Sequence, residues 1–189
     1  MAWERNVLHM PMDNFLEQII VRRQKGLQSM LYALCWAAIV FFGIIALFFL
    51  QTTVMSLNFD PIGIFILLVT GGIAVLLFIR KDRLRVEYEY TFTNGEMDFA
   101  RVYGNTRRKE LGTMKVRNVQ ACGWVQHASF QRYITMPTIR KDNWFLNREA
   151  NLFYFYFERE GKKRVIVIEP SEEMAKLIRQ YAAPHAFQG

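Results

Sequence analysis

The chain has 189 residues with a formal net charge of +7, and 52% of its residues are apolar and 15% aromatic. This composition is sufficient for a hydrophobic core. It excludes a disulfide-rich secreted domain, because the only cysteines, Cys35 and Cys122, support neither a disulfide framework nor a cysteine metal site. The apolar residues are unevenly spread, and this unevenness is the first guide to how the chain is organised.

Residues 1–25 are interpreted as a cytoplasmic leader. Four apolar residues recur with helical spacing and predict an amphipathic helix over Pro11–Lys25: Phe15, Leu16, Ile19 and Ile20. Two placements are open, a helix lying on the membrane surface and a helix packed on the C-terminal domain. We favour the first, because an apolar span follows within a few residues. Trp3 is either an interface anchor or a tail residue.

Residues 26–80 predict a two-helix transmembrane hairpin. No charged residue occurs in 27–50 or in 62–79, and as helices these segments would extend about 36 Å and about 27 Å, which suits a bilayer core of about 30 Å. The alternative is a pair of buried core helices. Small residues allow close helix contact, so Gly71 and Gly72 are expected to pack against a surface that includes Gly43.

The flanking charges predict the orientation of the hairpin. Cations precede the first span at Arg22, Arg23 and Lys25, and others follow the second span at Arg80, Lys81, Arg83 and Arg85. The intervening segment Gln51–Pro61 is expected to be a loop and has no Lys or Arg. Positively charged flanks stay in the cytoplasm, so the chain is expected in the cell membrane as a multi-pass protein with both termini cytoplasmic. The first apolar run is too long for a cleaved signal peptide.

Residues 81–189 predict a cytoplasmic β domain. Val86, Tyr88, Tyr90 and Phe92 alternate with polar residues, as in a half-buried strand. The dipeptide Asn94-Gly95 then predicts a hairpin turn, since both residues tolerate positive φ. A returning strand is expected over Met97–Tyr103, followed by a turn at Gly104-Asn105.

Four further strands and a final helix are expected after this turn. Strands are expected near 107–111, 116–125, 152–157 and 164–169, with a long loop over 127–150 that holds at most one short strand near Tyr133. Aromatic and basic residues alternate in that loop, a pattern seen in membrane or partner contacts and, more often, in core aromatics. Ser171 is expected to cap a final helix with an apolar stripe that includes Met174 and Ile178, and Pro184 ends it.

The predicted fold class is an α+β membrane protein, in which a transmembrane helical hairpin precedes an antiparallel β-barrel or sandwich closed by a C-terminal helix. This element order resembles the pleckstrin-homology (PH-like) superfold. The segments Tyr88–Asp98, Arg107–Lys109 and Glu169–Met174 are similar to those of a family of bacterial two-span membrane proteins with a C-terminal PH-like domain. The resemblance implies this fold over most of the chain, but it brings no activity and no catalytic residues.

No catalytic constellation stands out in the sequence. His9, His127 and His185 lack metal-ligand spacing, and no nucleotide-binding or nucleophile motif is present. Glu87 and Glu89 are read as a solvated strand edge rather than as an acid/base pair. We therefore expect a protein that is not an enzyme, with no cofactor, no metal, no specific nucleic acid and no small-molecule substrate.

Basic clusters are the candidate contact sites, either for anionic lipid or for a protein partner. The alternative is that these turns are basic only for solubility. The candidates are Arg80, Lys81, Arg83, Arg85, Arg107, Arg108, Lys109, Lys162, Lys163 and Arg164. The expected partners are the lipid bilayer and a protein, or a second copy of the chain.

Three functions remain open at this point. The first is a membrane-anchored, non-enzymatic scaffold or interaction module. The second is an accessory or regulatory subunit of a membrane transport or secretion complex, with contacts through the glycines of the spans. The third is a lipid-acting membrane enzyme.

Overall fold

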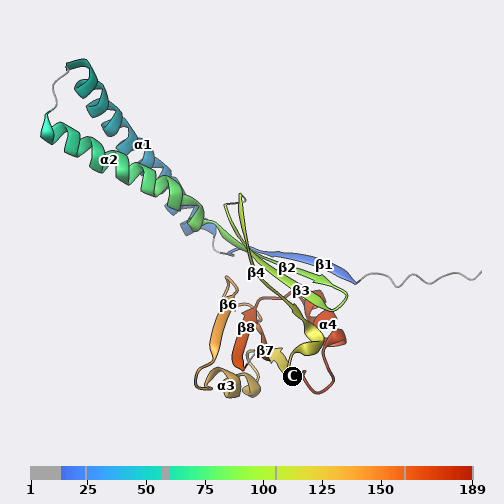
Figure 1. Cartoon of the computed structure of the whole chain (residues 1–189). Coiled ribbons are helices and arrows are strands. Elements are labelled where there is room, and N and C mark those ends of the chain that lie inside the picture. The colour runs from blue at the N-terminus through green and yellow to red at the C-terminus, as the bar shows by residue number, and fades with distance from the viewer. Residues whose placement is uncertain (1–13, 24, 57–59, 105, 160, 189) are drawn as a thin grey trace, which may run out of the picture. The chain divides into compact units, whose positions relative to one another are not determined.

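The computed structural model describes residues 14–23, 25–56, 60–104, 106–159 and 161–188 (Figure 1). Contacts divide the chain into two compact units. Among the described residues, those in 21–87 and 101–109 form one, here called the helical unit, and those in 14–20, 88–100 and 110–188 form the other, here called the β unit.

Two antiparallel helices dominate the helical unit. Helix α1 spans Lys25–Ser56 and helix α2 spans Pro61–Arg80. Asp60 caps α2, because its Oδ2 accepts a hydrogen bond from the Gly63 amide at 2.9 Å, and Pro61 occupies the first helical position. The two expected spans are therefore helical, and both helices are long and apolar enough to cross a membrane.

The expected loop over Gln51–Pro61 is wrong in its first half, because α1 continues through Ser56. The hydroxyls of Thr52 and Thr53 donate to the Phe49 carbonyl at 3.0 and 2.8 Å. Residues 51–56 contain no Gly or Pro. The two hydroxyls find hydrogen-bond partners inside the helix, so α1 accommodates polar residues beyond the apolar run.

Neither long helix is a buried core helix. Large apolar side chains face outward along both, with Phe41 60% and Leu47 65% exposed on α1, and Phe65 67% and Leu68 68% exposed on α2. In a water-soluble unit, such a continuous apolar surface would need a cover. The exposure agrees with helices that face hydrocarbon.

The first four-stranded sheet has the order β1-β2-β3-β4. Its strands are β1 Phe15–Ile20, β2 Val86–Thr93, β3 Glu96–Tyr103 and β4 Arg107–Lys115. The turn expected at Asn94-Gly95 is confirmed, with φ values of 49° and 88°. Tyr88, Tyr90 and Phe92 are buried, as the alternation in β2 predicts.

Strand β1 replaces the predicted amphipathic helix, so both placements of that helix are wrong. Residues Phe15–Ile20 pair antiparallel with β2, from Phe15 opposite Thr93 to Ile20 opposite Tyr88. The Asn14 amide donates to Asn94 Oδ1 at 3.0 Å and fixes the start of the strand. Pairing with β2 makes this segment a strand although its apolar residues do not alternate, because the backbone of β2 supplies the hydrogen-bond partners. Trp3 lies outside the described residues.

The second sheet has the order β5-β7-β8-β6. Its strands are β5 Ala121–Trp124, β6 Arg140–Trp144, β7 Phe153–Arg159 and β8 Lys162–Ile168. Strand β6 runs parallel to β8, so the prediction of a wholly antiparallel domain is wrong at this edge. A single-turn 3-10 helix at Val116–Asn118 shortens the strand that was expected over 116–125.

The predicted long loop over 127–150 contains a helix and a strand. Helix α3 spans Ala128–Ile134 and is capped by the His127 ring, whose Nδ1 accepts from the Ser129 amide. Strand β6 follows it. The strand was missed because its sequence is mostly polar, which a strand at the edge of a sheet tolerates. Tyr133 and Trp144 are buried, which confirms the core interpretation of these aromatics.

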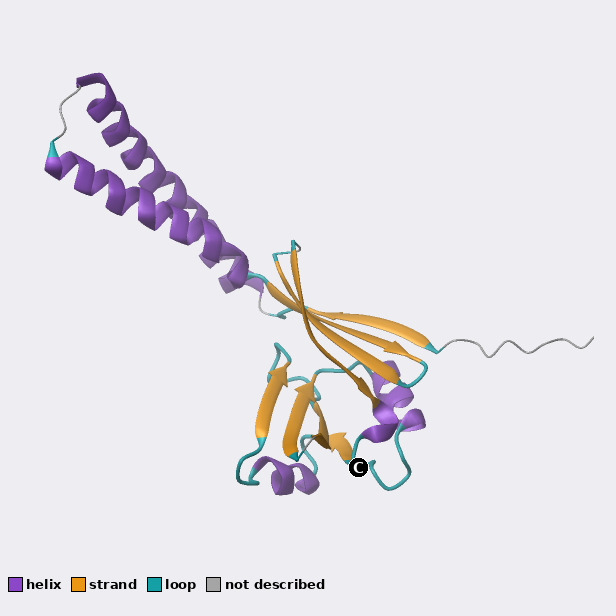
Figure 2. Cartoon of the chain, viewed as in Figure 1, coloured by secondary structure: helices purple, strands orange, loops and turns teal. Residues whose placement is uncertain are grey.

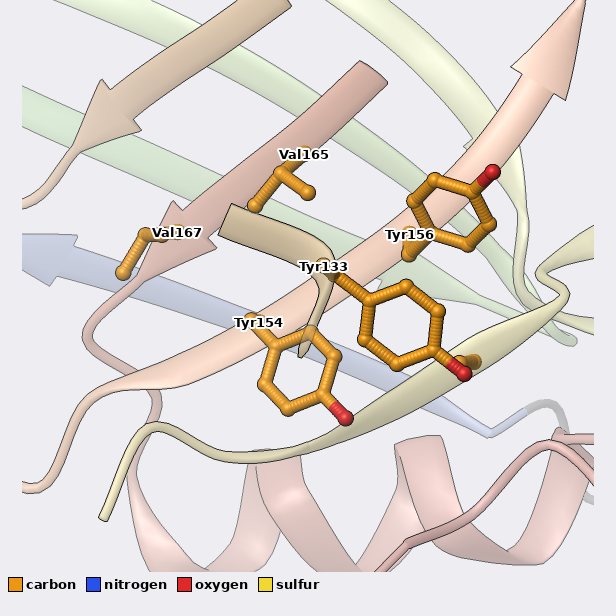
Figure 3. Close-up of a cluster of buried hydrophobic side chains, with 6 residues drawn as sticks. Tyr133, Tyr154, Tyr156, Val165 and Val167 are labelled. Carbon is orange, nitrogen blue, oxygen red and sulfur yellow. The ribbon is translucent and has the colours of Figure 1, made fainter. Parts of the chain in front are cut away.

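The β7–β8 pair is buried on both faces over residues 153–156 and 165–168. Tyr154 and Tyr156 lie on one face with Val165 and Val167, where Tyr133 of α3 packs between the two tyrosine rings (Figure 3). Its ring stacks on Tyr156 with centroids 4.5 Å apart. Because neither face meets water there, the sequence of β7 begins with an uninterrupted apolar run.

The other face of the second sheet meets the first sheet. Phe99 of β3 packs on Trp144 of β6 with ring centroids 4.8 Å apart. The buried Tyr90 hydroxyl donates to the Trp144 carbonyl and accepts from the Glu169 amide. The sheets remain two separate sets of strands, so the domain is not a closed barrel.

The C-terminal helix is confirmed. Helix α4 spans Glu172–Tyr181 (Figure 2). Ser171 Oγ accepts from the Met174 amide at 3.2 Å. The segment after it pairs with β5, where the Cys122 amide donates to the Ala186 carbonyl at 2.7 Å. Gly123 is required there, since a Cβ would clash with the backbone oxygen of Gln188.

The buried Cys122 thiol makes stability depend on alkaline pH. Desolvation raises its pKa from the ordinary value of 9.0 to about 12. Between these values the unfolded chain releases this proton while the folded chain keeps it, so the free energy of unfolding should fall as pH rises from 9 toward 12. The expected slope is at most about 1.4 kcal/mol per pH unit.

Denaturant unfolding of the native chain and of Cys122→Ala at pH 8, 9, 10 and 11 measures this effect. Subtracting the free energy of unfolding of the variant from that of the native chain removes the contribution of the buried tyrosines, which both proteins share. A difference between the two proteins that stays constant over this range would contradict the prediction.

Candidate functional site

A basic groove lies in the helical unit where the end of α2 meets the β3–β4 turn. Its volume is about 690 Å³. Three cations, two apolar residues of α2 and three other polar residues line it: Arg83, Arg107, Lys109, Phe78, Ile79, Asp82, Tyr103 and Thr106. The short 3-10 helix η1, Lys81–Leu84, forms one wall.

A close backbone approach places the β3–β4 turn against η1. The Gly104 amide donates to the Arg85 carbonyl at 2.8 Å, with Gly104 at a φ of 56°. A Cβ at this position would lie 3.0 Å from Asp82 Oδ1. Glycine therefore permits both the left-handed turn and the contact, which brings the start of β4 to the end of α2.

Cation–aromatic contacts hold η1 against α1. Lys81 Nζ lies 4.7 Å from the Phe78 ring centroid and 5.6 Å from that of Trp36, and it pairs with Asp82 Oδ1 at 2.9 Å. The Arg85 guanidinium stacks 3.7 Å from the centroid of Tyr32. The Lys81 side chain is only 14% exposed, so it acts mainly within the fold.

The structure sorts the ten predicted contact residues into two places. Arg80, Lys81, Arg83, Arg85 and Arg107–Lys109 all lie in the helical unit, whereas Lys162, Lys163 and Arg164 lie in the β unit. Only Arg83, Arg107 and Lys109 of the first group line the groove, and all three are exposed. The second group borders a different cleft.

The glycines expected to pack between the helices behave differently from one another. Gly71 lies against α1, where its Cβ would be 3.8 Å from the Cβ of Ala46. Gly43 and Gly72 face open space, with no neighbouring atom within 4 Å of an added Cβ. The contact between α1 and α2 therefore uses Gly71 and not the other two.

Two aromatic residues that contact cations near η1 were missed from the sequence. Tyr32 and Trp36 are one helical turn apart on α1 and receive Arg85 and Lys81. Aromatic residues near the polar end of an apolar helix are typical of a membrane interface, and that signal would have pointed to them.

The groove is suited to binding an anion beside an apolar surface. Among the described residues that line it, Asp82 is the only carboxylate, and it is already paired with Lys81. In the described part of the chain, no group of three or more His, Cys, Asp or Glu residues is placed to hold a metal ion. The available chemistry is electrostatic attraction by three cations, next to Phe78 and Ile79.

A covered, paired cation such as Lys81 should contribute more to stability than an exposed cation of the groove such as Lys109. Lys81→Ala removes two ring contacts and an ion pair, and is expected to lower the free energy of unfolding by about 1 kcal/mol. Lys109→Ala, at an exposed position, should change it by less than about 0.5 kcal/mol. Thermal unfolding of both variants in one neutral detergent measures this, and equal effects would contradict the assignment.

Residues 12–188 match the family described as a bacterial PH-like domain, DUF6106. No curated protein and no solved structure matches the chain. The matched region includes β1, both long helices, both sheets and the C-terminal helix. The chain therefore belongs to the bacterial PH-like domain family DUF6106.

Proposed function

We propose that this protein is a membrane-anchored, non-enzymatic interaction module that presents its PH-like domain at the cytoplasmic face of the cell membrane. The observation that carries the proposal is the basic groove. Arg83, Arg107 and Lys109 surround a hollow whose other wall includes Phe78 and Ile79 at the end of an exposed apolar helix. An anionic lipid, with charge and hydrocarbon adjoining, matches that pairing.

Helix dimensions support a bilayer crossing. Helix α2 has 20 residues, a length of about 30 Å, which equals the thickness of a typical hydrocarbon core. Helix α1 is longer, with 32 residues, and its part from Trp36 to Met55 would also span about 30 Å. Trp36 and its neighbour Lys81 would then lie at the interface, where such side chains are favoured.

The cations that flank both helices support the proposed orientation. With both chain ends cytoplasmic, the segment between α1 and α2 faces outward. Single cysteines test the orientation in a chain whose native cysteines are replaced by alanine. One replaces Met55, which is 78% exposed, and the other replaces Lys176 on α4. In intact bacterial cells, a membrane-impermeant maleimide should label Met55→Cys at once and Lys176→Cys only after lysis. Labelling of Lys176→Cys in intact cells would overturn the orientation.

The lipid contact is tested with soluble, short-chain lipids. Dihexanoyl phosphatidylglycerol should raise the thermal midpoint of the detergent-solubilised full chain more than dihexanoyl phosphatidylcholine does, because a ligand of the folded state stabilises it. The variant Arg83→Gln/Arg107→Gln/Lys109→Gln should lose most of the difference. At roughly 1 kcal/mol per cation, its affinity should fall about 100-fold.

A matched variant controls for net charge. Lys162→Gln/Lys163→Gln/Lys176→Gln removes the same number of charges from the β unit and should keep the response to phosphatidylglycerol. Added salt should weaken the effect in the native chain. An equal loss in both triple variants, or an equal response to the two lipids, would refute the role of the groove.

A second candidate function is an accessory subunit of a membrane transport or secretion complex. It is favoured by the open space at Gly43 and Gly72, which leaves these glycines available to another transmembrane helix. A lipid-acting enzyme is the third candidate. The paired state of Asp82 disfavours it, and mass spectrometry of the phosphatidylglycerol recovered from the same samples would reveal any turnover.

A further inference from the structure

A second cleft lies wholly within the β unit, between the outer strands of the two sheets. Strand β4 ends the order of the first sheet and β6 ends that of the second, so among the described strands each has one unpaired side. Residues Gly112–Met114 of β4 and Arg140 and Trp144 of β6 line the cleft. The sandwich is open along this seam, in contrast to the β5 edge, which the segment at Ala186–Gln188 covers.

The bottom of the cleft is aromatic and its rim is basic. Phe99, Trp144 and Phe157 supply the apolar surface, and Arg140, Lys162 and Lys163 stand around it. The volume is about 190 Å³. This lies below the roughly 300 Å³ at which pockets for small-molecule ligands begin, and it suits one anchoring side chain.

The charges of the rim are only partly compensated within the fold. Asp142 is shared, with its Oδ2 2.5 Å from Arg164 Nε and 3.2 Å from Arg140 Nε. Arg164 is 26% exposed and also lies 5.3 Å from the Trp144 ring, so it belongs to the wall. Lys162 and Lys163 are exposed, and Lys163 lies opposite the exposed Glu158 in the β7–β8 register.

We propose that this seam binds an acidic, extended segment of a protein partner, which adds as a strand beside β4 or β6 and inserts one apolar side chain between Phe99, Trp144 and Phe157. Two strand edges supply backbone donors and acceptors, and the cleft between them supplies the pocket that gives specificity in strand addition. The surplus of cations selects for acidic residues on either side of the anchor.

Gly112 supports this use of the β4 edge. It adopts a φ of 147°, which L-residues rarely tolerate, and no atom lies within 4 Å of an added Cβ. The backbone is therefore accessible at the point where β4 borders the cleft. The proposal does not depend on the lipid groove, since its residues belong to the other unit.

The experiment uses the full chain in phosphatidylcholine nanodiscs. The probe is a fluorescein-labelled, capped peptide with one phenylalanine between two pairs of glutamates, and fluorescence anisotropy reports its binding. Saturable binding is expected. The same peptide with serine in place of phenylalanine should bind at least fivefold more weakly, and the peptide with lysines in place of glutamates should not bind.

Protein variants locate the site. Lys162→Glu/Lys163→Glu should weaken binding at least tenfold and leaves Asp142, Arg164 and the aromatic residues in place. Lys176→Glu/Arg132→Glu makes the same change of charge on the exposed surfaces of α4 and α3 and should leave binding nearly unchanged. Hydrogen exchange should slow on peptide addition at Gly112–Met114 or at Arg140–Trp144.

Three results would overturn the proposal. They are the absence of saturable peptide binding, an equal loss in the two double variants, and capture of phosphatidylglycerol vesicles that depends on Lys162 and Lys163 while the peptide fails to bind. The last result would assign the cleft to lipid rather than to a protein segment.

Discussion

The β7–β8 hairpin carries apolar side chains on both of its faces, and the β unit is arranged around the need to cover them. Phe153 and Phe155 point to one face and Tyr154 and Tyr156 to the other, and all four are buried. A strand pair without a polar face is stable only between two layers. The first sheet provides one layer, and α3 with Tyr133 provides the other (Figure 3).

Polar groups within this core determine how the layers meet. The Tyr90 hydroxyl joins the Trp144 carbonyl to the Glu169 amide, and burial raises the pKa of this phenol. The Glu169 carboxylate accepts from the Asn147 amide at 3.1 Å and from its side-chain Nδ2 at 2.9 Å. Because unsatisfied buried groups are costly, these contacts favour one alignment of the sheets and one path for the loop after β6.

The same cationic residue types serve different roles according to their neighbours. Lys81 and Arg164 are largely covered, each beside aromatic rings and paired with a carboxylate, so they contribute to the fold. Arg107 and Lys163 are exposed beside hollows with apolar walls, where a ligand can use their charge. Solvation and pairing, rather than residue type, distinguish a structural cation from one available for binding.

The sequence by itself determined the elements whose local chemistry has one solution. The alternation in β2, the positive-φ turn at Asn94-Gly95 and the Ser171 cap are all present in the structure, because short-range sterics and hydrogen bonds decide them. Only the tertiary structure decided that Phe15–Ile20 is a strand, since its partner β2 lies about 70 residues further along the chain. It also decided that β6 runs parallel to β8, that the sheets stay open, and that Arg83 and Arg107 line one groove beside α2. Such pairings depend on which edges and surfaces meet after the chain has folded, and no local pattern of residues contains that information.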